Sequence, residues 1–122
     1  MKKILVIIML FAANFIQAQN KSAKASIEVD GVCMMCKMRI EKAALKTKGV
    51  KSAVWDLETH MLNLIYNETK TQLEIIEQNL AKVGHDTKNF KAAEEAYNSL
   101  DACCKYRDPK VIEDHKKEGI EN

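Results

Sequence analysis

Two cysteines separated by two residues are the part of this sequence best suited to chemistry. Cys33 and Cys36 follow Gly31, at the point where a segment of alternating apolar residues ends and a run of good helix formers begins. This spacing places both sulfur atoms on one loop, within reach of a single metal ion or of each other. The unpaired N–H groups at a helix start favour thiolate over thiol, and Lys37 and Arg39 should act in the same direction. The sequence therefore predicts soft-metal binding or thiol chemistry at Cys33 and Cys36.

A second pair of cysteines stands far along the chain, at Cys103 and Cys104. Adjacent cysteines are sterically poor partners for each other, so two interpretations stay open. The pair could supply further thiolate ligands, either beside Cys33 and Cys36 or at a separate metal site. Alternatively, it could form disulfides that attach the C-terminal segment to the body of the protein, because connectivity is not readable from sequence.

Residues 1–18 have the pattern of an export signal. A basic start, Met1-Lys2-Lys3, precedes an apolar run from Ile4 to Ala13 that is too short to span a bilayer. Cleavage after Ala18 would give a periplasmic or secreted protein with no stable membrane insertion. The chain has 19 Lys and Arg and 17 Asp and Glu, and removing the two N-terminal lysines makes these numbers equal. This balance gives no reason to expect a nucleic acid or an anionic membrane as partner.

The rest of the chain alternates between the hydrophobic periods of strands and of helices. The predicted strands are 25–30, 50–57, 61–67 and, more weakly, 85–90, and the predicted helices are 34–48 and 69–83, the latter capped by Thr69 or Thr71. Gly49 and Gly84 provide the helix stop signals. This order predicts an α+β fold, the ferredoxin-like βαββαβ sandwich, with two helices on one face of a four-stranded antiparallel sheet.

The predicted domain covers residues 25–90. Residues 19–24 are expected to be a flexible lead-in after the export signal. Residues 91–122 are expected to form a C-terminal extension, with a helix near 91–100, the Cys-Cys pair and a charged tail that is only partly helical. His115 in that tail should be solvated.

The segment from Gly31 to Ala43, the later Gly49-Val50 and the hairpin after it resemble the heavy-metal-associated domain of copper chaperones, metal-transport ATPases and periplasmic mercury-binding proteins. The resemblance covers roughly residues 25–90 and implies that Cys33 and Cys36 are the metal ligands. One departure is that only Val32 separates Gly31 from the first cysteine, where the family has Gly-Met-x-Cys.

The resemblance also implies that the turn containing His85 lies beside the metal loop. His85 could then be a third ligand or a cation near the thiolates. We favour a solvent-exposed turn histidine over these roles, since most lone histidines are not ligands.

Two thiolates without a nearby carboxylate suit Cu(I), Ag(I) or Hg(II) better than Zn(II), which takes four ligands, and Cu(I) is our prediction. Met34, Met35 and Met38 are expected to pack rather than to bind metal. An exposed loop would let a transport ATPase or another metal carrier take the metal by ligand exchange.

Two other function classes remain as alternatives, a periplasmic thiol–disulfide redox protein and a domain held together by disulfides. Thioredoxin-like folds need a proline opposite the active cysteines, and the one proline here, Pro109, stands in the tail. The sequence shows no nucleophile motif, carboxylate pair or phosphate-binding loop, so we do not expect an enzyme.

Overall fold

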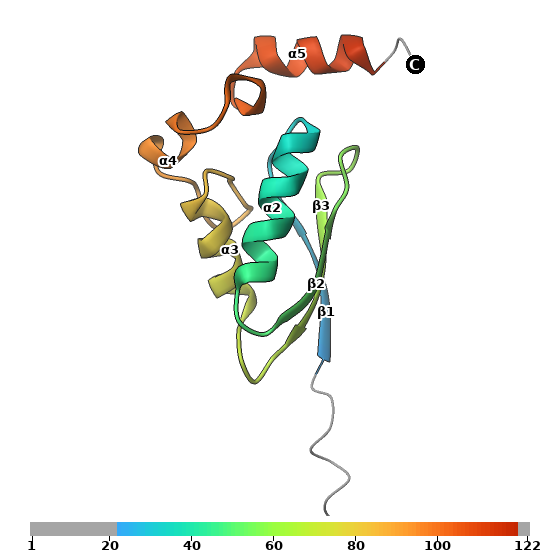
Figure 1. The fold of residues 1–122 in the computed structure, drawn as a ribbon, viewed down its shortest axis with the longest axis vertical. Coiled ribbons are helices and arrows are strands. Elements are labelled where there is room, and N and C mark those ends of the chain that lie inside the picture. Colours follow the sequence, from blue (N-terminus) through green and yellow to red (C-terminus); the bar gives the residue numbers. More distant parts are fainter. Residues whose placement is uncertain (1–21, 120–122) are drawn as a thin grey trace, which may run out of the picture.

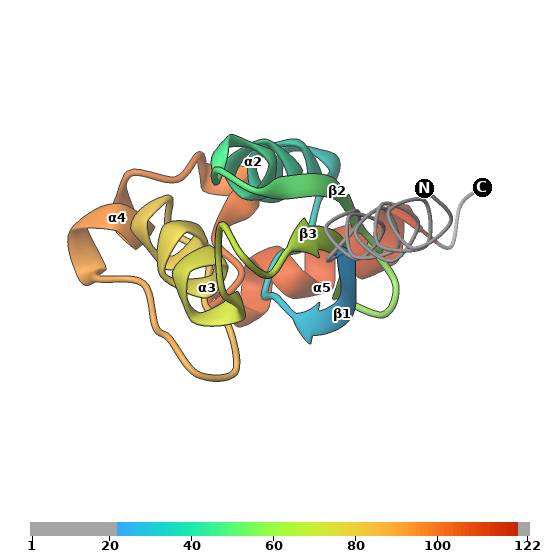
Figure 2. The same ribbon diagram turned by 90° about the horizontal axis from the view of Figure 1, so that it is seen from below.

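The structure is a computed structural model that describes residues 22–119, so the predicted export signal and residues 19–21 lie outside the described part. A three-stranded antiparallel sheet forms its centre, with strand order β1-β3-β2. The strands are β1 (Ser22–Glu28), β2 (Val50–Trp55) and β3 (Met61–Asn67). Two helices, α2 (Met34–Lys46) and α3 (Leu73–Lys82), lie side by side on one face of this sheet (Figures 1 and 2). The predicted α+β, ferredoxin-like arrangement is confirmed.

The first strand begins earlier than the sequence indicates. Ser22 pairs with Asn67 and Glu28 with Met61, so residues 22–24 belong to the sheet and are not a lead-in. The side chains of β1 alternate between exposed and half-buried positions, and its apolar members pack against the core. Small alanines made this end of the strand hard to recognise from hydrophobicity alone.

The prediction of a fourth strand over 85–90 is wrong. In the structure this segment makes one isolated β-bridge, between Thr87 and Val29. The Asp86 carbonyl accepts the N–H of Asp30 at 2.9 Å, but two N–H groups of the segment have other partners. The N–H of Asp86 donates to the Tyr106 hydroxyl at 2.9 Å, and the N–H of Thr87 donates to the Phe90 carbonyl at 2.8 Å. These groups are therefore not available for a strand ladder.

Both helices end where the glycines predict. Gly49 and Gly84 have φ values of 98° and 103°, a backbone conformation that favours glycine. The predicted threonine cap of the second helix is wrong, because α3 starts after Gln72 without a side-chain cap. Thr71 is instead buried beside the helix start.

The C-terminal extension contains three short elements: α4 (Glu94–Asn98), the 3₁₀ turn η2 (Ala102–Cys104) and α5 (Pro109–Glu118). The helix expected near 91–100 is thus shorter than predicted. The charged tail, in contrast, forms a regular helix, because Asp108 accepts a hydrogen bond from the N–H of Lys110 and Pro109 occupies the first turn. Figure 1 shows η2 and α5 above the end of the domain where α2 begins.

The extension shares one core with the domain. The largest fully buried apolar side chains of the domain include Trp55, Ile40, Leu62, Ile76 and Leu80. The same cluster also contains residues of the extension, namely Tyr97, Leu100, Cys104 and Tyr106. Residues 91–107 are therefore a packed part of the molecule. Between residues 22 and 119, no helix combines the length and apolar character that a membrane span requires.

Candidate metal centre

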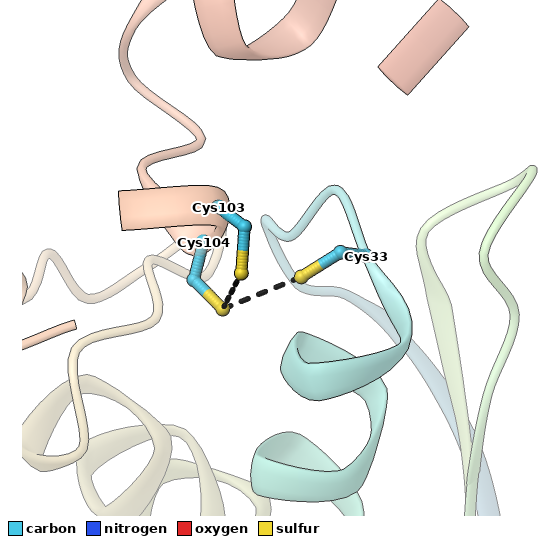
Figure 3. A group of neighbouring side chains, drawn as sticks. All are labelled: Cys33, Cys103 and Cys104. Carbon is cyan, nitrogen blue, oxygen red and sulfur yellow. Dashed lines mark hydrogen bonds between the residues drawn. The ribbon is translucent and has the colours of Figure 1, made fainter. Parts of the chain in front are cut away.

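The four cysteine sulfurs lie in one group at the start of α2. The Sγ atom of Cys33 is 3.3 Å from that of Cys36 and 3.3 Å from that of Cys104. The Sγ atoms of Cys103 and Cys104 are 3.9 Å apart, and those of Cys33, Cys103 and Cys104 all lie within 4.8 Å of one another. Figure 3 shows these three side chains pointing toward a common point from η2 and from the loop before α2. The structure thus brings together the two cysteine pairs whose relation the sequence left open.

Cys33 takes the N-cap position of α2. Its backbone is extended, as is usual at an N-cap, and its carbonyl accepts the N–H of Lys37 at 3.1 Å. No side chain caps the helix start by a hydrogen bond. The Cys33 side chain therefore occupies the place where serine or aspartate usually satisfies the first N–H groups. Cys36 follows one turn later, on the buried side of the helix.

Gly31 allows the loop to lie close to the core. A Cβ atom at Gly31 would lie 3.0 Å from Cys36 Cβ and 3.0 Å from the Trp55 ring atom Cη2. Trp55 is fully buried, and its indole N–H donates to the carbonyls of Val29 at 3.0 Å and His60 at 3.2 Å. The indole ring thus packs directly against the loop that carries the cysteines.

The cysteines of the predicted exposed loop are buried, whereas Met34 and Met35 between them are exposed. Cys36 and Cys104 have no exposed surface, and Cys33 retains 9%. Burial raises the pKa of Cys33 to about 12, and the backbone N–H of Cys36 offsets this only in part. Burial also raises the pKa of Cys36. In the metal-free protein the helix start therefore does not keep Cys33 and Cys36 as thiolates.

Cys104 is the thiol whose pKa is lowered. Burial acts against its ionisation, but the nearby guanidinium of Arg39 and the neighbouring thiols of Cys33, Cys36 and Cys103 favour the thiolate and lower this pKa. Proximity to the Cys33 loop and to Arg39 makes Cys104 the first of these sulfurs to lose its proton.

The two basic residues after Cys36 have different roles. Nη2 of Arg39 binds Asp101 Oδ2 at 3.0 Å, whereas Nη1 is buried and has no hydrogen-bond partner among residues 22–119. Lys37 is engaged elsewhere, because its Nζ donates to Glu41 Oε1 at 2.5 Å and to the Trp55 carbonyl at 2.6 Å. Of the two, Arg39 favours a thiolate, and it does so at Cys104, whereas the prediction concerned Cys33 and Cys36.

His85 is buried, so its interpretation as an exposed turn residue is wrong. Its Nδ1–H donates to the Asp30 carbonyl at 2.7 Å, and its ring stacks on Tyr106 at a centroid distance of 5.6 Å. Burial lowers the pKa of His85 to about 4, so the ring is neutral near pH 7. The group of mutually close ligand atoms found in residues 22–119 consists of cysteines and does not include His85.

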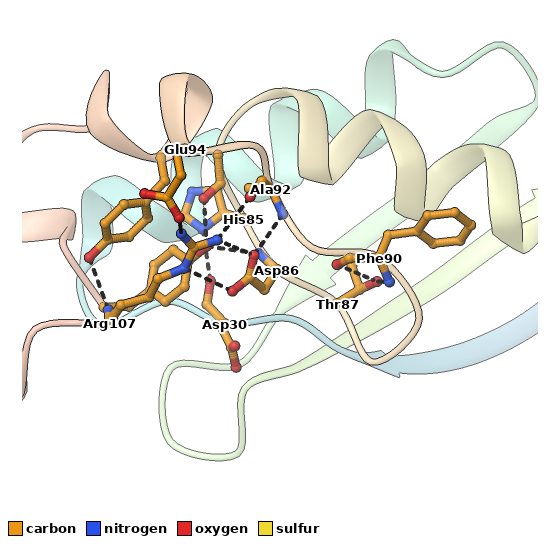
Figure 4. A network of polar contacts seen from close by, with 11 residues as sticks. Asp30, His85, Asp86, Thr87, Phe90, Ala92, Glu94 and Arg107 are labelled. Carbon is orange, nitrogen blue, oxygen red and sulfur yellow. Dashed lines mark hydrogen bonds and ion pairs between the residues drawn. The ribbon is translucent and has the colours of Figure 1, made fainter.

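Tyr106 and Arg107 attach the extension to the turn that contains His85. Figure 4 shows Arg107 beside Asp86 of this turn. The Tyr106 hydroxyl donates to the Gly84 carbonyl at 2.6 Å and accepts the N–H of Asp86. Arg107 makes two hydrogen bonds to the Asp86 carboxylate, at 2.7 and 3.1 Å, and its guanidinium lies 4.2 Å from the centre of the Tyr97 ring. These residues were not predicted from the sequence, although an aromatic residue and an arginine two and three positions after a Cys-Cys pair were a usable signal.

The outer edge of the sulfur group contains Cys103 and Met35, whose sulfur atoms lie 3.6 Å apart. Both side chains are partly or largely accessible, and Met34 and Met38 are exposed as well, so the packing role expected for the methionines is wrong. His115 is not simply solvated, because its Nε2–H donates to the Cys103 carbonyl at 2.8 Å. The last helix is thereby joined to the cysteine pair.

Comparison with known proteins agrees with this architecture. The model of the heavy-metal-associated domain matches residues 26–86. The copper-exporting P-type ATPase of Bacillus subtilis is 29% identical over 104 residues, which is 84% of this chain but only 13% of the ATPase. The copper chaperone CopZ of Staphylococcus epidermidis is 32% identical over 63 residues, 51% of this chain and 93% of CopZ.

Among solved structures, a CopZ metallochaperone superposes with a TM-score of 0.52 at 26% identity. The match covers 53% of this chain and 98% of the chaperone. The fold, the position of the CxxC pair and the match over residues 26–86 together show that the chain belongs to the heavy-metal-associated domain family.

Proposed function

We propose that this protein binds Cu(I) through Cys33 and Cys36 and transfers the ion to a protein partner by ligand exchange. The observation that carries the proposal is the 3.3 Å separation of the two Sγ atoms at the start of α2. Thiolates are soft ligands that select Cu(I) over hard cations. The names of the similar proteins, a copper chaperone and a copper-exporting ATPase, support the same metal.

The direct test is competition for Cu(I) between the reduced protein and a chromogenic Cu(I) chelator. We expect the wild-type protein to bind one equivalent tightly and the double variant C33S/C36S to lose this binding, because serine oxygen is a poor ligand for a soft ion. The variant C103S is the matched control, since it removes one accessible thiol at the edge of the group. Unchanged affinity in C33S/C36S would exclude this site.

Ag(I) and Hg(II) prefer the same ligands and should compete with Cu(I), whereas Zn(II) should compete poorly. The same titration, repeated with each ion, would rank them. Displacement of Cu(I) by an equimolar amount of Zn(II) would contradict the assignment of a soft-metal site.

The partner in our proposal is a transport ATPase or another metal carrier, and no catalysis by this chain is required. The test mixes the Cu(I)-loaded protein with an isolated metal-binding domain of a copper-exporting ATPase and measures the copper content of each after separation. Transfer in both directions toward one equilibrium is the signature of ligand exchange. Copper that stays with this protein at any ratio would instead indicate scavenging.

Our proposal also places the mature protein outside the cytoplasm, on the basis of the basic start and the apolar run Ile4 to Ala13. Expression of the full chain in a bacterial host, followed by fractionation and mass spectrometry, should yield a periplasmic product that begins at Gln19. An uncleaved product in the cytoplasm would contradict this.

A redox or structural role for the cysteines is the second candidate, and the 3.3 Å between the Cys33 and Cys104 sulfurs favours it. The distinguishing measurement is the number of free thiols in protein purified from the periplasm without reductant. Four free thiols support metal binding in that compartment, and a quantitative Cys33–Cys104 disulfide supports the second candidate.

A further inference from the structure

We propose that Cys104 of the C-terminal extension is the third thiolate ligand, so that Cys33, Cys36 and Cys104 bind one Cu(I) ion in a buried three-sulfur site. This inference rests on the proposed function and adds a ligand from outside the segment that matches the domain family. It also assigns a role to the extension, which otherwise only covers the metal loop.

The geometry supports three sulfurs around one ion. Cys33 has two sulfur neighbours, Cys36 and Cys104, each at 3.3 Å. A metal–thiolate bond of about 2.3 Å, the length known for zinc, separates the sulfurs of a trigonal site by about 4 Å. The Cys33–Cys36 and Cys33–Cys104 pairs therefore each have to move apart by less than about 1 Å, which rotation of a cysteine side chain provides.

Burial distinguishes Cys104 from its neighbour in sequence. Cys104 is fully buried on the side of Cys33 and Cys36, whereas Cys103 is partly exposed and lies against the Met35 sulfur. The inner three sulfurs are thus shielded from water, and the outer two are partly accessible to solvent. We assign Cys103 to this outer position and not to the three-sulfur site.

Charge at the site supports the same assignment. When three thiols bind one Cu(I), they release three protons to solvent and leave a net charge of minus two in a buried place. Such a charge requires a nearby cation. Arg39 supplies one, because its buried Nη1 has no hydrogen-bond partner among the described residues while its Nη2 is held by Asp101. Asp101 is the N-cap of η2, so the element that carries Cys104 also positions this cation.

The third ligand is held in place before metal arrives. Tyr106 and Arg107, two and three residues after Cys104, bind Gly84 and Asp86 of the domain. These contacts fix η2 relative to α2, which lowers the entropy cost of bringing a distant residue to the metal. Cys104 is accordingly a pre-positioned ligand and not one recruited from a free tail.

The test measures the sulfur coordination of Cu(I) in the full chain by X-ray absorption, together with the affinity by chelator competition. We expect three sulfur ligands in the wild-type protein. The variant C104S should show two, with a loss of affinity of at least about tenfold, the lower end of what even an outer-shell substitution costs. The variant C103S separates the two candidate third sulfurs, because Cys103 also lies within 4.8 Å of Cys33 and Cys104. Three sulfur ligands retained in C103S support Cys104 as the third ligand, and a drop to two would overturn that assignment.

Each outcome decides a separate question. Two sulfur ligands in the wild-type protein, or unchanged coordination and affinity in C104S, would overturn the three-sulfur site while leaving the proposed function intact. No tight Cu(I) binding by the wild-type protein would overturn the proposed function itself. Thermal melts of the metal-free variants check folding, and C104A repeats the test with an apolar side chain. If neither variant folds, the coordination numbers of the wild-type protein and of C103S decide, since three sulfur ligands in both leave Cys104 as the third ligand.

Discussion

Cys33 and Cys104 are 71 positions apart in the sequence, yet their Sγ atoms lie 3.3 Å apart in a buried contact. One belongs to the N-cap of α2 and the other to the turn η2. The C-terminal extension is therefore part of the candidate site, and changes to it should alter the cysteine chemistry as well as the stability of the fold.

The first prediction concerns mild oxidation of the reduced, metal-free protein. We expect the first disulfide to join Cys33 and Cys104, because the lowered pKa of Cys104 makes it the attacking thiolate and Cys33 is its nearest partner. The two thiols lose two electrons to the added oxidant, and Cu(I) binding should fall until a reductant is added. Peptide mapping by mass spectrometry identifies the bond, and a Cys33–Cys36 disulfide formed first would refute the prediction.

The second prediction is that R107A destabilises the protein by about 1 to 3 kcal/mol. The substitution removes the hydrogen bonds to the largely buried Asp86 carboxylate and the stacking on Tyr97. Because Arg107 itself is partly exposed, the loss should be smaller than for a fully buried pair. Urea unfolding measures it.

The matched control for R107A is K117A, which breaks the exposed Lys117–Glu113 pair of α5. This change should alter the free energy of unfolding by less than about 0.5 kcal/mol. Equal effects of the two variants would mean that the Asp86 contact does not attach the extension.

The third prediction is that the metal-free, reduced protein loses stability as the pH falls from about 7 to 4. The pKa of His85 is about 4 in the folded protein, below its ordinary value of 6.5, so over this range the unfolded chain binds a proton that the folded protein does not. The resulting slope is at most about 1.4 kcal/mol per pH unit. Urea unfolding at several pH values gives the slope, and H85N should reduce it. An identical slope in H85N would exclude His85 as the cause.

The fourth prediction is that G31A destabilises the protein by about 1 to 3 kcal/mol and weakens Cu(I) binding. The added methyl group would lie 3.0 Å from Cys36 Cβ and from the Trp55 ring, and both residues are fully buried and have little room to move. The loop that carries Cys33 would have to shift outward. Thermal unfolding and chelator competition measure the two effects.

Gly119 provides the control for Gly31. A Cβ atom there would lie 3.7 Å from its nearest neighbours, which is an ordinary van der Waals contact. G119A should therefore change stability by less than about 0.5 kcal/mol and leave Cu(I) binding as it is. Equal losses in the two variants would show that close packing at Gly31 is not what positions the loop.

The elements formed by local pattern were predictable from sequence. The alternation in β2 and β3, the apolar stripe of α3 and the stops at Gly49 and Gly84 agree with the structure. The pairing of Cys33 and Cys36 on one loop also follows from their spacing. Their role as metal ligands stays a prediction.

The predictions that were wrong, a fourth strand over 85–90 and an exposed His85, concern features that depend on contacts between residues distant in the sequence. The segment after α3 is not a strand because Tyr106, twenty residues further on, takes the N–H of Asp86. His85 is buried for the same reason, since the Tyr106 ring covers it. The hydrophobic periodicity of the sequence does not indicate such long-range contacts. A charged segment with single aromatic residues, such as the C-terminal extension, is therefore predicted to be solvated.

The place of Trp55 under the cysteine loop gives the molecule a built-in optical probe. It is the one tryptophan of the chain, and its ring lies against the backbone of Gly31 and beneath the helix start. Its fluorescence therefore comes from a single position and depends on the packing of that loop. A change in emission during a titration would report directly on the cysteine region, without any label attached to the thiols.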